Sequence, residues 1–111
     1  MTSPKIKKPR KPKEVNVMGA PYSIEFKPLK DLFGITYLTD RKILINTDNS
    51  EPIQKETLLH ELLHVCLEES PGLLNKKYAA EEREELIISH CSPRLFQLLR
   101  DNPKVKHYIL D

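Results

Sequence analysis

The chain has 111 residues, the size of one domain with one modest hydrophobic core. Hydrophobic residues make up 39% and charged residues 31%, and there is no apolar run long enough to cross a bilayer or to act as an N-terminal signal peptide. We therefore expect a cytoplasmic protein that does not bind membranes. Its two cysteines, Cys66 and Cys91, are expected to be reduced, with a disulfide between them as the alternative.

The net charge of +2 conceals a basic N-terminal segment, MTSPKIKKPRKPK, which has six Lys or Arg residues and no acid. Its three prolines and single isoleucine cannot nucleate packing, so we expect residues 1–14 to form a disordered basic tail and residues 15–111 to form the domain. Two interpretations of the tail stay open. It is either a solubilising extension or an electrostatic contact with nucleic acid or another acidic surface.

The first half of the domain has the pattern of β-strands. Apolar residues alternate with polar ones over residues 21–27, which predicts a strand with one buried face. Two further β-rich runs, Ile35–Thr39 and Lys42–Asn46, are separated by Asp40-Arg41 and predict an antiparallel hairpin.

The second half has the pattern of helices. Pro52 fits the first turn of a helix running to about Glu69, and its leucines surround nearly the whole circumference, so we expect it to be buried on all sides. A second helix is predicted over Ala79–Cys91, and Ser92-Pro93 would cap and start a third that ends at the sequence DNP. Strands followed by helices indicate an α+β domain.

The first predicted helix contains the sequence His60-Glu61-Leu62-Leu63-His64. Residues four apart lie on one helix face, so both imidazoles can bind one Zn²⁺ ion, while Glu61 is placed to act as general base toward a zinc-activated water. The alternative is a hydrogen-bonded histidine pair in a leucine core. Burying two histidines and a glutamate without a partner is costly, so the metal site is the better interpretation.

A catalytic zinc site needs a third protein ligand. Cys66 points to another helix face, which leaves the glutamates of the second helix. At 100° per residue, Glu84 falls within the apolar arc of that helix and Glu81 on its edge, whereas Glu82 and Glu85 point away. Glu84 is therefore the predicted third ligand, with Glu81 and Glu85 as alternatives.

Four stretches of the chain carry a family resemblance. The sequences FGITYLTDRKILIN, QKETLLHELLHVCL, EEREELI and SPRLFQLLRDNP resemble the small ImmA/IrrE-like zinc peptidases, including minimal forms from phages and prophages, and a glutamate after the two histidines is similar to the gluzincin arrangement. The resemblance covers roughly residues 20–110. It implies a minimal zincin fold, with a small antiparallel sheet, an active-site helix and a glutamate helix. Lys42–Asn46 would be the edge strand that pairs with substrate.

The resemblance also implies a function. It indicates a zinc metallopeptidase that cuts a protein or peptide, and relatives of this kind cut repressors or regulators. A phage-encoded member would act in the host cell cytoplasm. The chain lacks a DNA-binding or sensor domain like that of longer relatives, and it lacks their Ala-Asn pair after the ligand glutamate, which leaves the third ligand open among the three glutamates.

Other residues are candidates for supporting roles. Thr57 shares the face of the two histidines and is expected to hydrogen-bond within the site. An oxyanion-stabilising residue is left open among four candidates: Tyr37, Tyr78, Arg83 and His90. The competing function is a zinc-stabilised binding protein that sequesters a partner without cleaving it, with or without a nucleic-acid tether supplied by the tail.

Overall fold

Apolar alternation at the start of the domain produces a β-hairpin. The computed structural model describes residues 10–68 and 80–111 of the chain. Within them, β1 (Glu14–Val17) pairs antiparallel with β2 (Ala20–Lys27), and Met18 and Gly19 form the turn with φ angles of 52° and 83°. Positive φ at both central residues is the geometry of a tight hairpin turn. β2 matches the strand expected at 21–27, and β1 is an additional strand.

The second hairpin is confirmed, but its place in the sheet is not the expected one. β3 (Gly34–Tyr37) and β4 (Lys42–Asn46) pair antiparallel, whereas β2 and β4 pair parallel, so the sheet is mixed and has the order β1-β2-β4-β3. The expected α+β class is confirmed, but the sheet contains one parallel pair, and the expected edge position of Lys42–Asn46 is wrong. Ile43, Leu44 and Ile45 are all buried, and a continuous apolar run belongs in a central strand. The edge is β3.

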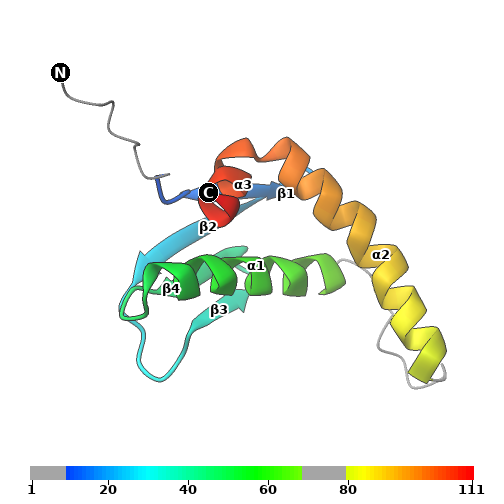
Figure 1. Ribbon diagram of the computed structural model, residues 1–111, viewed down its shortest axis with the longest axis horizontal. Helices are drawn as coiled ribbons and strands as arrows, with labels where there is room; N and C mark the ends of the chain where they lie inside the picture. Colours follow the sequence, from blue (N-terminus) through cyan, green and yellow to red (C-terminus); the bar gives the residue numbers. More distant parts are fainter. Residues whose placement is uncertain (1–9, 69–79) are drawn as a thin grey trace.

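The predicted active-site helix is confirmed as α1 (Glu51–Glu68), which packs across the sheet (Figure 1). Leu58, Leu62 and Val65 lie on its inner face and are fully buried. The expectation of burial on all sides is wrong, because Leu63 is 40% exposed and the histidines on either side of it are exposed as well. α1 therefore has one buried face and one open face.

The two helices expected after α1 are a single helix in the structure. α2 (Ala80–Asp101) continues through Pro93, contrary to the predicted break at Ser92-Pro93. Pro93 lacks the N–H group that would bond the Ser89 carbonyl four residues earlier. At the next position, Arg94 Nη1 donates to the His90 carbonyl at 2.9 Å. Figure 1 shows α2 changing direction in its orange part. The chain then turns at Asn102 into α3 (Pro103–Leu110).

Asn102 joins the two ends of the domain. Its Oδ1 accepts from the Asn16 amide at 2.9 Å, and its Nδ2 donates to the carbonyls of Asn16 and Leu98, each at 2.8 Å. The junction between α2 and α3 is thereby fastened to β1, and Val105 and Tyr108 of α3 complete the core.

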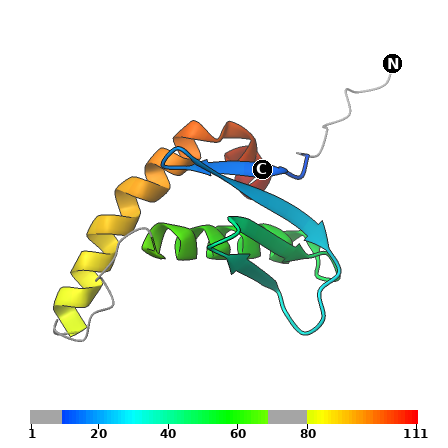
Figure 2. The same cartoon turned by 180° about the vertical axis from the view of Figure 1, so that it is seen from behind.

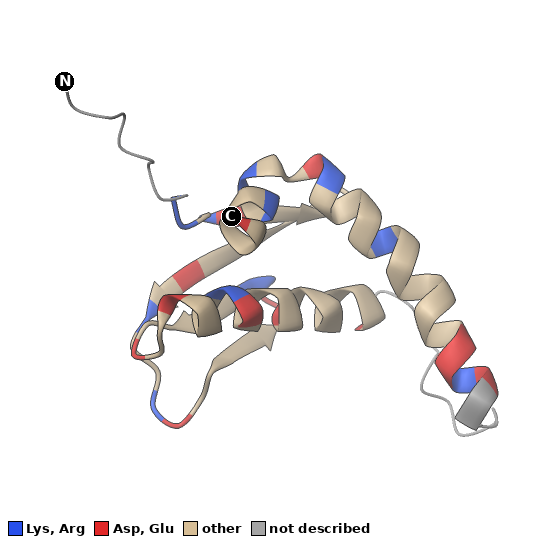
Figure 3. Cartoon of the chain, in the orientation of Figure 1, with Lys and Arg blue, Asp and Glu red and all other residues tan. Residues whose placement is uncertain are grey.

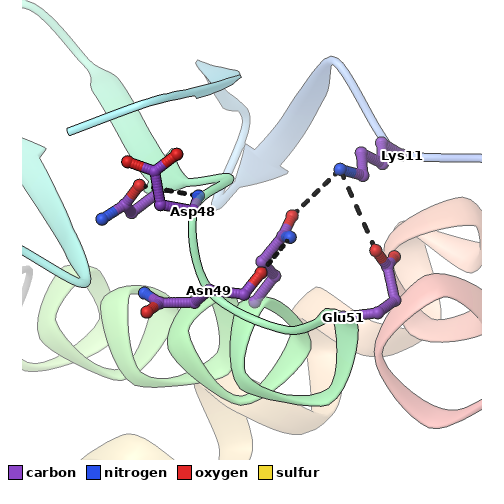
Figure 4. A network of polar contacts seen from close by, with 6 residues as sticks. Lys11, Asp48, Asn49 and Glu51 are labelled. Carbon is purple, nitrogen blue, oxygen red and sulfur yellow. Dashed lines mark hydrogen bonds and ion pairs between the residues drawn. The ribbon is translucent and has the colours of Figure 1, made fainter.

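Residues 10–14, which were expected to belong to the tail, pack on the domain in the structure. Pro12 is buried, and Lys11 Nζ donates to Gln54 Oε1 at 2.9 Å and lies 4.0 Å from Glu51 Oε2 (Figure 4). The expectation of disorder for residues 1–9 falls outside the described residues. Across residues 10–68 and 80–111, no helix is long and apolar enough to cross a membrane.

Candidate active site

The open face of α1 presents the two motif histidines side by side. His60 and His64 are exposed, their Nε2 atoms are 3.1 Å apart, and their ring centroids are 4.8 Å apart. Two nitrogens that share a tetrahedral zinc ion at roughly 2.0–2.1 Å lie about 3.3 Å from each other. The observed 3.1 Å is a hydrogen-bond distance between the two rings, and it is also close to the separation that a shared ion requires.

Glu61 lies between α1 and the edge strand. Its side chain is 7% exposed, and its Oε2 accepts a hydrogen bond from Thr36 Oγ1 at 2.6 Å. A buried carboxylate needs such a partner, and the threonine hydroxyl provides it. Thr36 was not identified as a site residue from the sequence. The usable signal was the strand alternation, which puts residues 34 and 36 on the same face of β3.

The close approach of β3 to α1 depends on Gly34. A Cβ at this position would lie 2.7 Å from Thr57 Cγ2 and 2.9 Å from the Leu44 carbonyl oxygen, so a side chain would push the strand away. The Thr57 hydroxyl donates to the Ile53 carbonyl at 2.7 Å. Its expected hydrogen bond within the site is therefore not formed, and Thr57 instead packs against β3.

Two adjoining cavities flank Glu61 along β3. The larger, about 510 Å³, is lined by the apolar side chains of Leu32, Phe33 and Ile53, together with carboxylates that include Glu56. The smaller, about 310 Å³, lies on the His64 side. Both share Gly34 and Glu61, so together they form one groove between the edge strand and the helix, which we call the β3 groove.

The register of β3 determines which of its main-chain groups face outward. The Asn46 amide donates to the Phe33 carbonyl at 2.9 Å, so residue 33 faces β4. In an antiparallel pair, alternate residues share this orientation, which places the N–H and C=O groups of Ile35 and Tyr37 toward β4 as well. The N–H and C=O groups of Gly34 and Thr36 therefore point away from the sheet, where a further strand could pair.

The structure does not bring the predicted third ligand to the histidines. Glu84 and Glu85 are exposed on the first turns of α2, which extend away from the sheet (Figures 1 and 2), and these acidic turns are red in Figure 3. Within residues 10–68 and 80–111, no three His, Cys, Asp or Glu side chains group as a metal site. The side chain of Glu81 lies outside the described residues. The third ligand remains a prediction.

The oxyanion candidates are not part of the β3 groove in the described structure. Tyr37, Arg83 and His90 line neither cavity, and His90 Nδ1 is instead 3.3 Å from Arg94 Nη1. Tyr78 lies outside the described residues.

Comparison with protein families now identifies the chain. The model of the IrrE N-terminal-like domain, peptidase family M78, matches residues 24–91, more than half of the chain. The chain belongs to this family. The match extends from β2 into α2 and includes the His-Glu-x-x-His motif and all the candidate glutamates. Membership confirms the ImmA/IrrE-like resemblance and indicates a peptidase-type function in general terms.

The matched region leaves out two parts of the domain. Residues 10–23, which include β1, and residues 92–111, which include α3, lie outside it. Comparison with curated proteins and with solved structures gives no match in either set.

Proposed function

We propose that the protein is a zinc-dependent peptidase that hydrolyses peptide bonds of a protein substrate. The observation that carries the proposal is the pair of Nε2 atoms 3.1 Å apart on His60 and His64, one helical position from a buried glutamate that faces a groove. Membership of a zinc metallopeptidase family supports it.

His60 and His64 would hold the zinc ion, with Glu84 as the proposed third ligand and Glu81 and Glu85 as alternatives. The two imidazole nitrogens are suitable donors for zinc, and both are accessible on the open face of α1. When bound, zinc supplies Lewis-acid polarisation of the scissile carbonyl and makes water nucleophilic near neutral pH.

Glu61 is the proposed general base. Its carboxylate lines both cavities, so it can accept a proton from the attacking water and pass it to the leaving amine. The hydrogen bond from Thr36 occupies Oε2 and fixes the orientation of the carboxylate, leaving Oε1 as the atom that takes the proton.

The substrate is proposed to bind as an extended strand in the β3 groove. The outward main-chain groups of Gly34 and Thr36 would pair with its backbone. Leu32, Phe33 and Ile53 form an apolar surface beside this edge, which suits a large apolar side chain of the substrate.

The test combines metal analysis with proteolysis. Purified wild type, Glu61→Gln and the exposed control Glu82→Gln are analysed for bound zinc, then incubated with unfolded casein while new N-termini are counted by mass spectrometry. We expect all three to bind zinc and Glu61→Gln alone to lose cleavage. A wild-type protein that binds no zinc under zinc-replete conditions would refute the proposal.

A second candidate function is binding without cleavage. It is favoured by one observation, that the described residues do not assemble a three-ligand metal group. Glu61→Gln discriminates between the two functions in the cell. If the variant retains the full biological effect of the wild type, sequestration is the function and catalysis is not.

A further inference from the structure

A second concave surface lies away from the β3 groove, between the segment before β1 and α3. It encloses about 690 Å³, and we call it the basic groove. In Figures 1 and 2 the dark-blue segment before β1 and the red helix α3 lie side by side, and Figure 3 shows blue, basic positions on both. Charged side chains dominate its lining: Arg10, Lys11, Lys13, Glu14, Lys104 and His107.

The cations of the basic groove are only partly compensated within the chain. Lys11 is held by Gln54 and Glu51, and His107 Nδ1 lies 2.5 Å from Asp111 Oδ2. In contrast, the exposed side chains of Arg10, Lys13 and Lys104 form no ion pair with any residue in the described ranges. Glu14 is the one acid in this lining, so the three unpaired cations leave an excess of positive charge that attracts anions.

The basic groove is built from fixed parts of the fold. The Lys13 carbonyl accepts from the Ile24 amide at 2.8 Å, and the ammonium of Lys11 also lies 5.0 Å from the Phe26 ring centroid. On the other side, Lys104 is on the first turn of α3. This turn directly follows Asn102, whose side chain is hydrogen-bonded to Asn16 of β1, a set of contacts that we call the Asn102 clamp. The cations from the two ends of the chain are therefore held opposite one another.

We propose that the basic groove binds the phosphodiester backbone of nucleic acid, independently of base sequence. The sequence before Arg10 carries three more lysines and no acid, so the cations continue along the chain as a linear series. Nucleic acid offers a matching linear series of phosphates, one charge per roughly 1.7 Å of duplex. No Phe, Tyr or Trp lines the groove within the described residues, so phosphate contacts rather than base stacking would supply the binding.

This binding is separate from the proposed peptidase function. Neither cavity of the β3 groove is lined by Lys or Arg in the described structure, whereas acidic residues such as Asp31, Glu56 and Glu68 line it. A polyanion is therefore repelled from the peptidase site and attracted to the opposite charge of the basic groove. The two ligands would not compete for one surface.

The test is fluorescence anisotropy of the full chain with a labelled DNA duplex of random sequence over a series of salt concentrations. Lys104→Gln is the decisive variant, because Lys104 lies in the basic groove and far from the N-terminal segment in sequence. Lys106→Gln is its matched control: it is exposed on the same helix, loses the same charge, and does not line the groove. Circular dichroism checks that both variants fold.

We expect Lys104→Gln to weaken binding and to lower the magnitude of the salt slope by about 0.9, the effect of one lost phosphate contact, with Lys106→Gln close to wild type. Equal effects of the two variants, or no binding by the wild type at low salt, would overturn the proposal. Two further probes test other partners. If polyglutamate binds as tightly as DNA and with the same dependence on Lys104, the groove binds an acidic protein instead. If anionic phosphatidylserine vesicles do so, it binds a membrane.

Discussion

Thr36 on the edge strand donates a 2.6 Å hydrogen bond to Glu61 on α1, and this contact links the two walls of the β3 groove. The strand that would hold the substrate is thus bonded to the proposed general base. A substrate that pairs with β3 would therefore be aligned against Glu61, because Thr36 belongs to this strand and its hydroxyl bonds the Glu61 carboxylate.

We predict that Thr36→Val lowers kcat about 10–100-fold with little change in KM, because the isosteric side chain keeps the packing and removes the hydrogen bond that orients Glu61. Thr36→Ser should restore most of the activity, since it restores the hydroxyl. Steady-state kinetics on a cleaved peptide, with zinc content measured in parallel, checks this. A serine variant as impaired as the valine variant would show that Thr36 acts through packing alone.

Gly34→Ala should destabilise the domain by about 1–3 kcal/mol, the range for forcing extra atoms into a packed region. The added methyl group would meet Thr57 Cγ2 and the backbone oxygen of Leu44, and the backbone cannot yield easily. Urea unfolding measures the change. Gly19→Asn is the matched glycine control, because Gly19 has open space around its Cβ position and asparagine tolerates its positive φ. Equal losses in both variants would contradict the packing argument.

Zinc should raise the free energy of unfolding of the wild type by about 2.7 kcal/mol at a free concentration 100 times its Kd. Glu84→Gln should bind zinc more weakly and lose most of this gain at the same concentration, while the exposed Glu82→Gln should keep it. Thermal unfolding with and without zinc provides the readout. Loss of the zinc effect in Glu81→Gln or Glu85→Gln instead would reassign the third ligand to that residue.

Stability should fall at alkaline pH because of Tyr108. Burial, and then the neighbouring Glu51 carboxylate, raise the pKa of Tyr108 well above its usual value of 10.0. Tyr108 ionises at a lower pH in the unfolded chain than in the folded one. Its contribution to the free energy of unfolding is therefore fully present below pH 10, and above pH 10 the free energy of unfolding falls by up to about 1.4 kcal/mol per pH unit. Tyr108→Phe should flatten this loss in urea unfolding followed from pH 9 to 11. An unchanged alkaline slope in the variant would exclude Tyr108 as its source.

The sequence predicted best what depends on local spacing. The helix around His60, Glu61 and His64 was placed to within a residue or so at each end, because Pro52 and a continuous leucine pattern are local signals. The convergence of the two imidazoles follows from the four-residue spacing alone.

The remaining differences arise from contacts distant in sequence. The central position of β4 depends on its parallel pairing with β2, which no turn residue specifies, although the unbroken run Ile43–Ile45 was a usable signal. The contact of Thr36 with Glu61 depends on how closely β3 approaches α1, and that distance is set by packing at Gly34. Proline propensity alone predicts a helix break at Pro93, and the tertiary packing of α2 overrides it.

The Asn102 clamp also affects when β1 can pack stably during synthesis of the chain. β1 is synthesised well before its partner, because the Asn102 side chain that bonds it lies 86 residues later, at the start of α3. Until residues 102–108 emerge, β1 lacks both its Asn102 contacts and the cover of Val105 and Tyr108, and the hairpin it forms with β2 is a marginal structure by itself. A nascent or C-terminally truncated chain would therefore carry the complete His-Glu-x-x-His motif on an unfinished core. A stable core around β1 therefore forms only once α3 has been synthesised.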